Sequence, residues 1–122
     1  MFLLIDTTEQ EKIIVALLDK QGREVARREK KVFQISENLL PEVEKLLKAK
    51  KITAKDLTKI LVNPGPGGFS ATRTGVATAN ALAYALNIPM AEWPSGKVRE
   101  IVLPKYDKEP NITKPRPVFS PS

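Results

Sequence analysis

The glycine-rich segment from Gly65 to Ser70 has the sharpest pattern among the residues that could bind a ligand. It lies between an apolar run and an alanine-rich stretch, so it is expected to join a strand to the start of a helix. Backbone N–H groups are unpaired at a helix N-terminus, and glycines let a backbone approach an anion, so Gly65, Gly67 and Gly68 could bind a phosphate. The segment lacks, however, the Gly-Lys-Ser/Thr of a P-loop and the dinucleotide fingerprint. A tight turn whose glycines adopt positive φ angles is therefore the favoured interpretation.

Asp6, Thr7 and Thr8 form the second candidate site, directly after the first apolar run. A carboxylate followed by two hydroxyls could hold a hydrated Mg²⁺ or hydrogen-bond a phosphate. The same residues could equally form an ordinary turn in which side chains bond the backbone. Combined with the glycine-rich segment, the triplet leaves open one alternative function, an ATP- or ADP-binding module that uses Asp6 and residues 65–70.

The 122-residue sequence contains no histidine and no cysteine. These absences exclude a Ser-His-Asp triad, a cysteine nucleophile, and imidazole or thiolate metal ligands. Hydroxyl side chains occur in the alanine-rich stretch, but no evident base lies near them; they are Ser70, Thr72, Thr74 and Thr78. We therefore expect no catalytic residue, no metal site and no cofactor, and we disfavour a protease-type activity.

Basic side chains are in excess, with 20 Lys and Arg against 14 Asp and Glu, for a net charge of +6. This balance indicates phosphate-bearing or acidic partners or, with equal weight, an ordinary solvated surface. No apolar run approaches the roughly 20 residues of a membrane span. The first residues also lack the basic start of a secretory signal. We expect a cytoplasmic protein that does not bind membranes.

Apolar runs bounded by polar residues predict three consecutive strands, over residues 1–6, 12–19 and 23–33. Leucines at helical spacing then predict a helix from Ser36 to Lys50, capped by the Ser36 side chain. A strand over 59–63, an alanine-rich helix over 70–86 and a short strand over 90–93 follow. This order, βββαβαβ, is typical of an α/β protein with a mixed five-stranded sheet.

The composition changes after residue 96, because five of the ten prolines lie in residues 97–122. We therefore divide the chain into a domain over residues 1–96 and an extended proline-rich tail over residues 97–122. Residues 101–106 are apolar enough that we expect them to lie along the domain. Residues after Lys114 are expected to be mobile.

Small residues form a stripe along the alanine-rich helix at four-residue spacing: Ala71, Gly75, Ala79 and Ala83. Such a stripe permits close approach, either of a second subunit or of the chain's own sheet. Glycine inside a helix costs about 1 kcal/mol relative to alanine, so some neighbour must require the missing methyl of Gly75. Arg73, nearby, could bind a partner's carboxylate as a fork or form a surface ion pair of little value.

Three segments resemble the TsaB family, the non-catalytic subunits of bacterial tRNA threonylcarbamoyladenosine modification. They are Asp6-Thr7-Thr8, residues 36–41 (SENLLP) and residues 65–83 (GPGGFSATRTGVATANALA). The family's usual strings are DTS, HSExLLP and GPGSFTGLRIGVATAKGLA, in the same order and at the same spacing. The likeness covers residues 1 to about 94, and the tail also resembles the family's carboxy-terminal end. The sequence departs from the family at Ile35, where a histidine is usual, and at Gly68, Ser70, Ala71, Thr72 and Thr74.

The resemblance implies an actin/Hsp70-like, ribonuclease H-like fold in a shortened form that lacks most of the family's second subdomain. It also implies a scaffold that supports the catalytic paralogue, TsaD, which modifies the adenosine next to the anticodon. The family's helical interface would here involve Ser36, Glu37, Leu40, Ala71, Arg73, Gly75, Ala79 and Ala83. The same surface would form homodimers, the ATPase subunit TsaE would bind where the two subunits meet, and tRNA would be contacted only indirectly.

Overall fold

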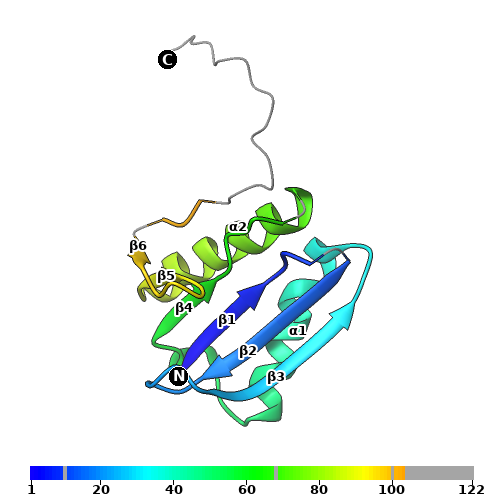
Figure 1. Cartoon of the computed structure of the whole chain (residues 1–122). Coiled ribbons are helices and arrows are strands. Elements are labelled where there is room, and N and C mark those ends of the chain that lie inside the picture. The colour runs from blue at the N-terminus through cyan, green and yellow to red at the C-terminus, as the bar shows by residue number, and fades with distance from the viewer. Residues whose placement is uncertain (10, 68, 100, 104–122) are drawn as a thin grey trace.

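The computed structural model describes residues 1–9, 11–67, 69–99 and 101–103 (Figure 1). The strands are β1 (Phe2–Asp6), β2 (Lys12–Leu18), β3 (Glu24–Lys31), β4 (Lys59–Val62), β5 (Met90–Glu92) and β6 (Val98–Arg99). The helices are α1 (Ile35–Ala49), the short 3-10 helix η1 (Ala54–Asp56) and α2 (Phe69–Leu86). The α/β architecture predicted from the sequence is confirmed.

One mixed sheet carries all six strands in the order β3-β2-β1-β4-β5-β6. The first three strands form an antiparallel meander, whereas β4 runs parallel to both β1 and β5. The predicted count of five strands was wrong, because β6 lies in the segment expected to be tail. Gly96, at a φ of +76°, lets the chain turn back after β5, and the Glu92 N–H donates to the Lys97 carbonyl at 2.9 Å.

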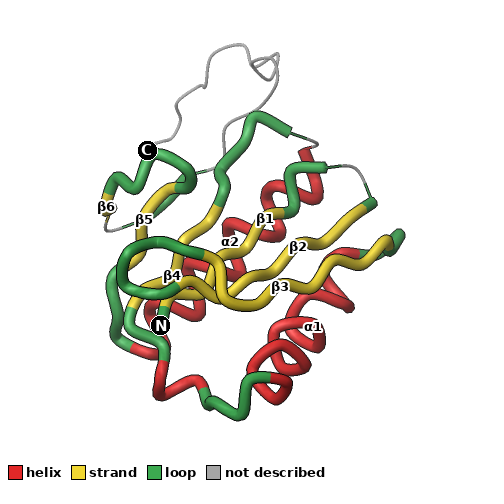
Figure 2. The backbone as a smooth tube through the Cα atoms, turned by 60° about the horizontal axis from the view of Figure 1, so that its bottom comes forward, coloured by secondary structure: helices red, strands yellow, loops and turns green. Residues whose placement is uncertain are grey.

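Both helices pack on the same side of the sheet (Figure 2). Alternate residues of β1 and β2 point toward them, because successive side chains of a strand face opposite sides. The main core therefore combines Leu3, Ile5 and Val15 with leucines of α1 and the buried positions of α2. A smaller buried cluster occupies the other face of the sheet, around Leu4, Ala16 and Leu61.

The start of α1 differs from the sequence prediction. The helix begins at Ile35, with Gln34 as its N-cap, and no side chain forms the capping hydrogen bond. Ser36 is an exposed residue of the first turn, so the expectation that it caps the helix was wrong. Burial of the apolar Ile35, which is 7% exposed, draws the first turn one residue earlier.

Residues 101–103 return to the domain and contact α2. Val102 is fully buried in the main core, and its backbone forms two hydrogen bonds with the side chain of Asn80. The Asn80 amide donates to the Val102 carbonyl at 2.9 Å and accepts from the Val102 N–H at 3.1 Å. This part of the expected packing of residues 101–106 is therefore observed; residues 104–106, and the segment after Lys114, lie outside the described residues.

Candidate functional site

The two loops singled out in the sequence meet at the carboxyl ends of β1 and β4, which are neighbouring parallel strands. Asp6 Oδ1 accepts hydrogen bonds from the Thr8 N–H at 2.9 Å and from the Thr8 hydroxyl at 2.7 Å. Asp6 Oδ2 accepts from the Asn63 amide at 3.1 Å, and Asn63 Oδ1 in turn accepts from the Gly65 N–H. Asp6 Oδ1 thus closes the turn to Thr8, and Asp6 Oδ2 joins that turn to the loop after β4.

Thr7 fixes the beginning of α2 to the end of β1. Its side chain is buried, and its hydroxyl donates to the Ala71 carbonyl at 2.6 Å. A methyl group at Gly75, one turn further along the helix, would overlap the Thr7 side chain. The missing methyl of Gly75 is therefore required by Thr7 of the same chain.

The glycine loop packs against the Asp6–Thr8 turn at similarly close range. A methyl at Gly67 would lie 2.7 Å from the Thr8 carbonyl oxygen and 2.8 Å from the Thr72 hydroxyl. Gly65 has a φ of +107°, a conformation that favours glycine. These contacts support the interpretation of residues 65–67 as part of a tight turn that leads into α2. Thr72 Oγ1 is buried with no hydrogen-bond partner among the described residues, and Gly68 lies outside them.

The stripe of small residues faces the interior of the chain's own fold. Ala79 and Ala83 are 0% and 6% exposed and belong to the main core, Gly75 contacts Thr7, and Ala71 is half-buried. Gly75, Ala79 and Ala83 therefore pack inside the chain's own fold, whereas contact of the half-buried Ala71 with a second subunit stays a prediction. Thr72 and Val76 are also buried on the side of α2 that faces the sheet. The small residues therefore lie on the sheet-facing side of the helix.

The outer face of α2 carries a different row of side chains. Arg73, Ala77 and Ala81 are exposed, and Tyr84 is 90% exposed. On α1, the predicted interface residues Ser36, Glu37 and Leu40 are also exposed. Because α1 and α2 are in contact on one side of the sheet, their outer faces adjoin. We call Glu37, Leu40, Arg73, Ala77, Ala81 and Tyr84 the helical surface.

Two polar residues with clear structural roles were missed in the sequence. Glu42 is buried on α1, and its carboxylate bonds Arg28 Nε at 2.9 Å, with Lys45 and Lys30 at 3.5 and 3.7 Å. Burial raises the pKa of Glu42, but the Arg28 hydrogen bond and the three cations outweigh it, so the pKa lies below its ordinary value. Asn80, which binds Val102, is the second. A signal existed for Glu42, because it interrupts the apolar face of its helix next to Val43.

Among the residues that the structure describes, no group of three or more acidic, histidine or cysteine side chains could hold a metal ion. Within the same ranges, no helix is long and apolar enough to cross a membrane. What the described residues do provide is a pair of joined loops above a mixed sheet and a helical surface on one side of it. These features define an α/β domain with both helices on one side of a mixed sheet, the arrangement that the resemblance to the actin-like class implies.

A family model described as TsaD, tRNA N6-adenosine threonylcarbamoyltransferase, matches residues 32–95, just over half of the chain. The tRNA threonylcarbamoyladenosine biosynthesis protein TsaB of Buchnera aphidicola subsp. Schizaphis graminum is 34% identical over 71 residues, covering 52% of this chain. TsaB of Bacillus subtilis is 40% identical over 52 residues, covering 43%. YeaZ from Pseudomonas aeruginosa superimposes with a TM-score of 0.67 at 30% identity over 75% of this chain. The chain therefore belongs to the family that this model describes and, within it, to the TsaB-type proteins.

The matches cover only part of each relative. The aligned region spans 34% of the Buchnera protein, 23% of the Bacillus protein and 43% of the Pseudomonas chain. The family model's match over residues 32–95 includes helix α2 and the loop before it.

Proposed function

We propose that this chain is a non-catalytic subunit of tRNA threonylcarbamoyladenosine biosynthesis, which binds and supports the catalytic threonylcarbamoyltransferase, TsaD. The names of its relatives support a role in this modification. The absence of histidine and cysteine from the sequence supports a non-catalytic role, because the common nucleophile–base pairs and imidazole metal sites need those residues.

The observation that carries the proposal is the helical surface. Ala77 and Ala81 are small and exposed on consecutive turns of α2, so another helix can approach the α2 backbone closely. Tyr84, 90% exposed, is of a residue type that contributes much of the binding energy at protein interfaces, and Leu40, 50% exposed, adds apolar area to the same surface. Arg73 and Glu37 add charges of opposite sign for pairing at the rim.

The same surface suits a second copy of the chain. A two-fold dimer requires one patch to be complementary to itself, and small, apolar and oppositely charged side chains together meet that requirement. Homodimer and heterodimer would then compete for one surface, with the ATPase subunit TsaE binding across the junction. All three associations are parts of the proposal.

The proposal is tested by co-purifying the full chain with the TsaD protein of its own organism and measuring the mass of the complex in solution. Ala81→Arg should abolish the complex, because it places a long charged side chain where close approach is needed. Tyr84→Ala should weaken it by roughly tenfold or more, as expected for a buried interface aromatic. Neither change should alter the urea midpoint of the monomer, measured at a chain concentration at which a homodimer is dissociated, since both side chains are exposed.

Ala49→Arg is the matched control, because Ala49 is an exposed alanine in the last turn of α1, outside the helical surface. It should leave the complex intact. A complex that survives Ala81→Arg, or that fails equally with Ala49→Arg, would remove the support for this surface.

Calorimetry with Mg-ATP tests the alternative function. Millimolar or weaker binding fits the scaffold, and micromolar binding would favour a nucleotide-binding module at Asp6 and residues 65–70.

A further inference from the structure

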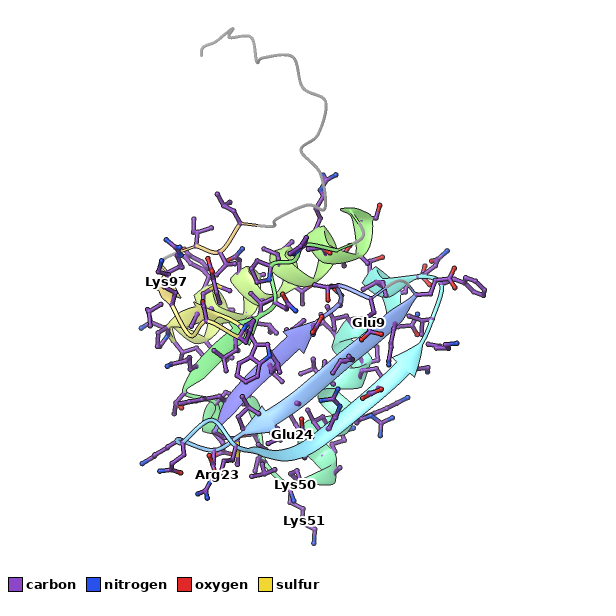
Figure 3. All side chains as sticks on the ribbon, in the orientation of Figure 1. Glu9, Arg23, Glu24, Lys50, Lys51 and Lys97 are labelled. Carbon is purple, nitrogen blue, oxygen red and sulfur yellow. The ribbon has the colours of Figure 1, made fainter. Side chains whose placement is uncertain are left out.

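Two segments far apart in the sequence come together at one end of the sheet. Leu18, at the end of β2, lies opposite Phe2, and Phe2 lies opposite Lys59 at the start of β4. The β2–β3 turn therefore adjoins the connection from α1 to β4, and the Thr58 N–H donates to the Met1 carbonyl at 2.9 Å. Figure 3 shows Arg23, Lys50 and Lys51 together at this end. We call residues 19–23 and 48–59 the basic pole.

The basic pole holds most of the net charge of the chain. It contains seven Lys and Arg and two Asp, which is a net charge of +5 out of +6 for the whole sequence. Both aspartates are engaged within their own turns. Asp19 accepts from the N–H groups of Gln21 and Arg23 and from Arg23 Nε, and Asp56 accepts from the Thr53 N–H. Glu24, which Figure 3 shows beside the pole, pairs with Arg27 at 2.9 Å.

Five exposed lysines of the pole make no ion pair among the described residues: Lys20, Lys48, Lys50, Lys51 and Lys55. On strands β2 and β3, by contrast, Lys12, Arg27 and Arg28 each contact a carboxylate, and Lys31 at the end of β3 makes no ion pair among the described residues. The helix dipole accounts for cations in the last turn of α1. It does not account for Lys20 or Lys55, which belong to other segments.

Lys51 occupies a position at which lysine carries a conformational cost. Its φ is +57°, and its N–H donates to the Lys48 carbonyl while the Ile52 N–H donates to the Leu47 carbonyl. Glycine is the usual residue at this helix-terminating position, because a Cβ is disfavoured at positive φ. A lysine at this position, in the same pole as four other unpaired lysines, indicates that its positive charge contributes to binding.

We propose that the basic pole binds the phosphate backbone of RNA directly. This inference rests on the proposed function, which supplies RNA as the polyanion, and it departs from the expectation that tRNA is contacted only indirectly. Lysines spread over two segments suit a phosphate backbone, because an ammonium group binds a phosphate as a point charge without the fixed fork geometry of arginine. No large exposed apolar side chain of the described residues lies within the pole, whereas a membrane-binding surface would combine its lysines with such side chains.

The test measures binding of a fluorescent tRNA transcript to the full chain at several salt concentrations. If about four phosphates are neutralised, affinity should fall roughly 100-fold between about 50 and 200 mM salt. The variant Lys50→Gln with Lys51→Gly should bind roughly tenfold more weakly at low salt, with a slope shallower by about two. Its urea midpoint should stay equal or rise, because glycine adopts the φ of Lys51 without cost. Weaker binding would then not result from unfolding.

The matched control is Lys31→Gln with Lys97→Gln, which removes the same charge from exposed sites outside the pole. It should change affinity by less than twofold. Equal losses in the two double variants, or no loss in the first, would overturn the inference. So would stronger binding to anionic lipid vesicles or to polyglutamate than to the transcript. Assembly with TsaD, measured on the same proteins, should persist in both; its absence in the unmodified chain would count against the proposed function and not against the RNA site.

Discussion

The contact between Thr7 and Gly75 predicts that a normally favourable substitution becomes unfavourable in this chain. Alanine in place of a helix-interior glycine ordinarily stabilises by about 1 kcal/mol. Here the added methyl would overlap the Thr7 side chain, which is held by its 2.6 Å hydrogen bond to the Ala71 carbonyl. Overpacking of this kind costs about 1–3 kcal/mol, and loss of the hydrogen bond adds about 1 kcal/mol. We expect Gly75→Ala to lower the free energy of unfolding by about 1–3 kcal/mol.

The sign of the effect should depend on Thr7. In a Thr7→Ala background the hydroxyl oxygen and Cγ2 are gone and only the Cβ of residue 7, 3.3 Å from the added methyl, remains, so Gly75→Ala should stabilise by up to about 1 kcal/mol, its ordinary helix propensity. The two positions should therefore couple by about 2 kcal/mol or more in a double-mutant cycle. Equilibrium urea unfolding measures all four proteins, with the single tryptophan, Trp93, as the fluorescence probe.

Ala77→Gly calibrates this experiment, because Ala77 is exposed on the same helix and should show only the propensity cost of about 1 kcal/mol. If Gly75→Ala stabilises the unmodified chain, or has the same sign in both backgrounds, the close packing of α2 on the β1 loop is wrong.

Three further predictions concern the core, the last described segment and the buried carboxylate. Ala79→Leu should destabilise the monomer by about 1–3 kcal/mol because Ala79 is fully buried, whereas Ala81→Leu should leave the thermal midpoint unchanged; equal effects would contradict the orientation of α2. Val102→Ala should cost about 2 kcal/mol in urea unfolding, and a neutral result would mean that residues 101–103 do not complete the core. Glu42→Gln should cost about 2 kcal/mol at pH 7, since a buried, cation-bonded carboxylate is replaced. Because the pKa of Glu42 is lowered on folding, its contribution is complete above the unfolded pKa of about 4.3 and is lost as the pH falls through the lower folded value. The difference between wild type and Glu42→Gln should therefore shrink as the pH drops below about 4, and a difference that stays constant as the pH falls to the acid unfolding of the protein would refute this assignment.

Hydrophobic periodicity predicted the strands and helices because burial on one side of a sheet imposes that periodicity. It missed β6, whose two exposed residues carry no such pattern, and the turn before it contains the proline and glycine that also characterise a tail. The sequence also predicted Ser36 as the helix cap. The actual start of α1 at Ile35 could not be predicted, because the burial of Ile35 depends on packing with other elements.

The candidate site was predicted in pieces. Asp6 and the glycine loop were identified separately, and the parallel pairing of β1 and β4 is what brings them together. The direction of the small-residue stripe could not be predicted, because alanines at four-residue spacing suit a sheet and a partner helix equally well. The direction follows from the contact between Gly75 and Thr7, two residues that are 68 positions apart in the sequence. The cations around Glu42 were likewise hidden, since Arg28 and Lys30 lie on β3.

Helix α2 is held at two separate places by segments remote from it in the sequence, at Ala71 by Thr7 and at Asn80 by Val102. A partner that docks on its outer face consequently meets a helix whose position is already set before the encounter. Little ordering entropy is then lost on association, and no folding step precedes it. The association rate constant should lie in the ordinary range of about 10⁵–10⁷ M⁻¹s⁻¹ for rigid protein surfaces, and variants such as Val102→Ala, which loosen the helix, should slow association more than they speed dissociation.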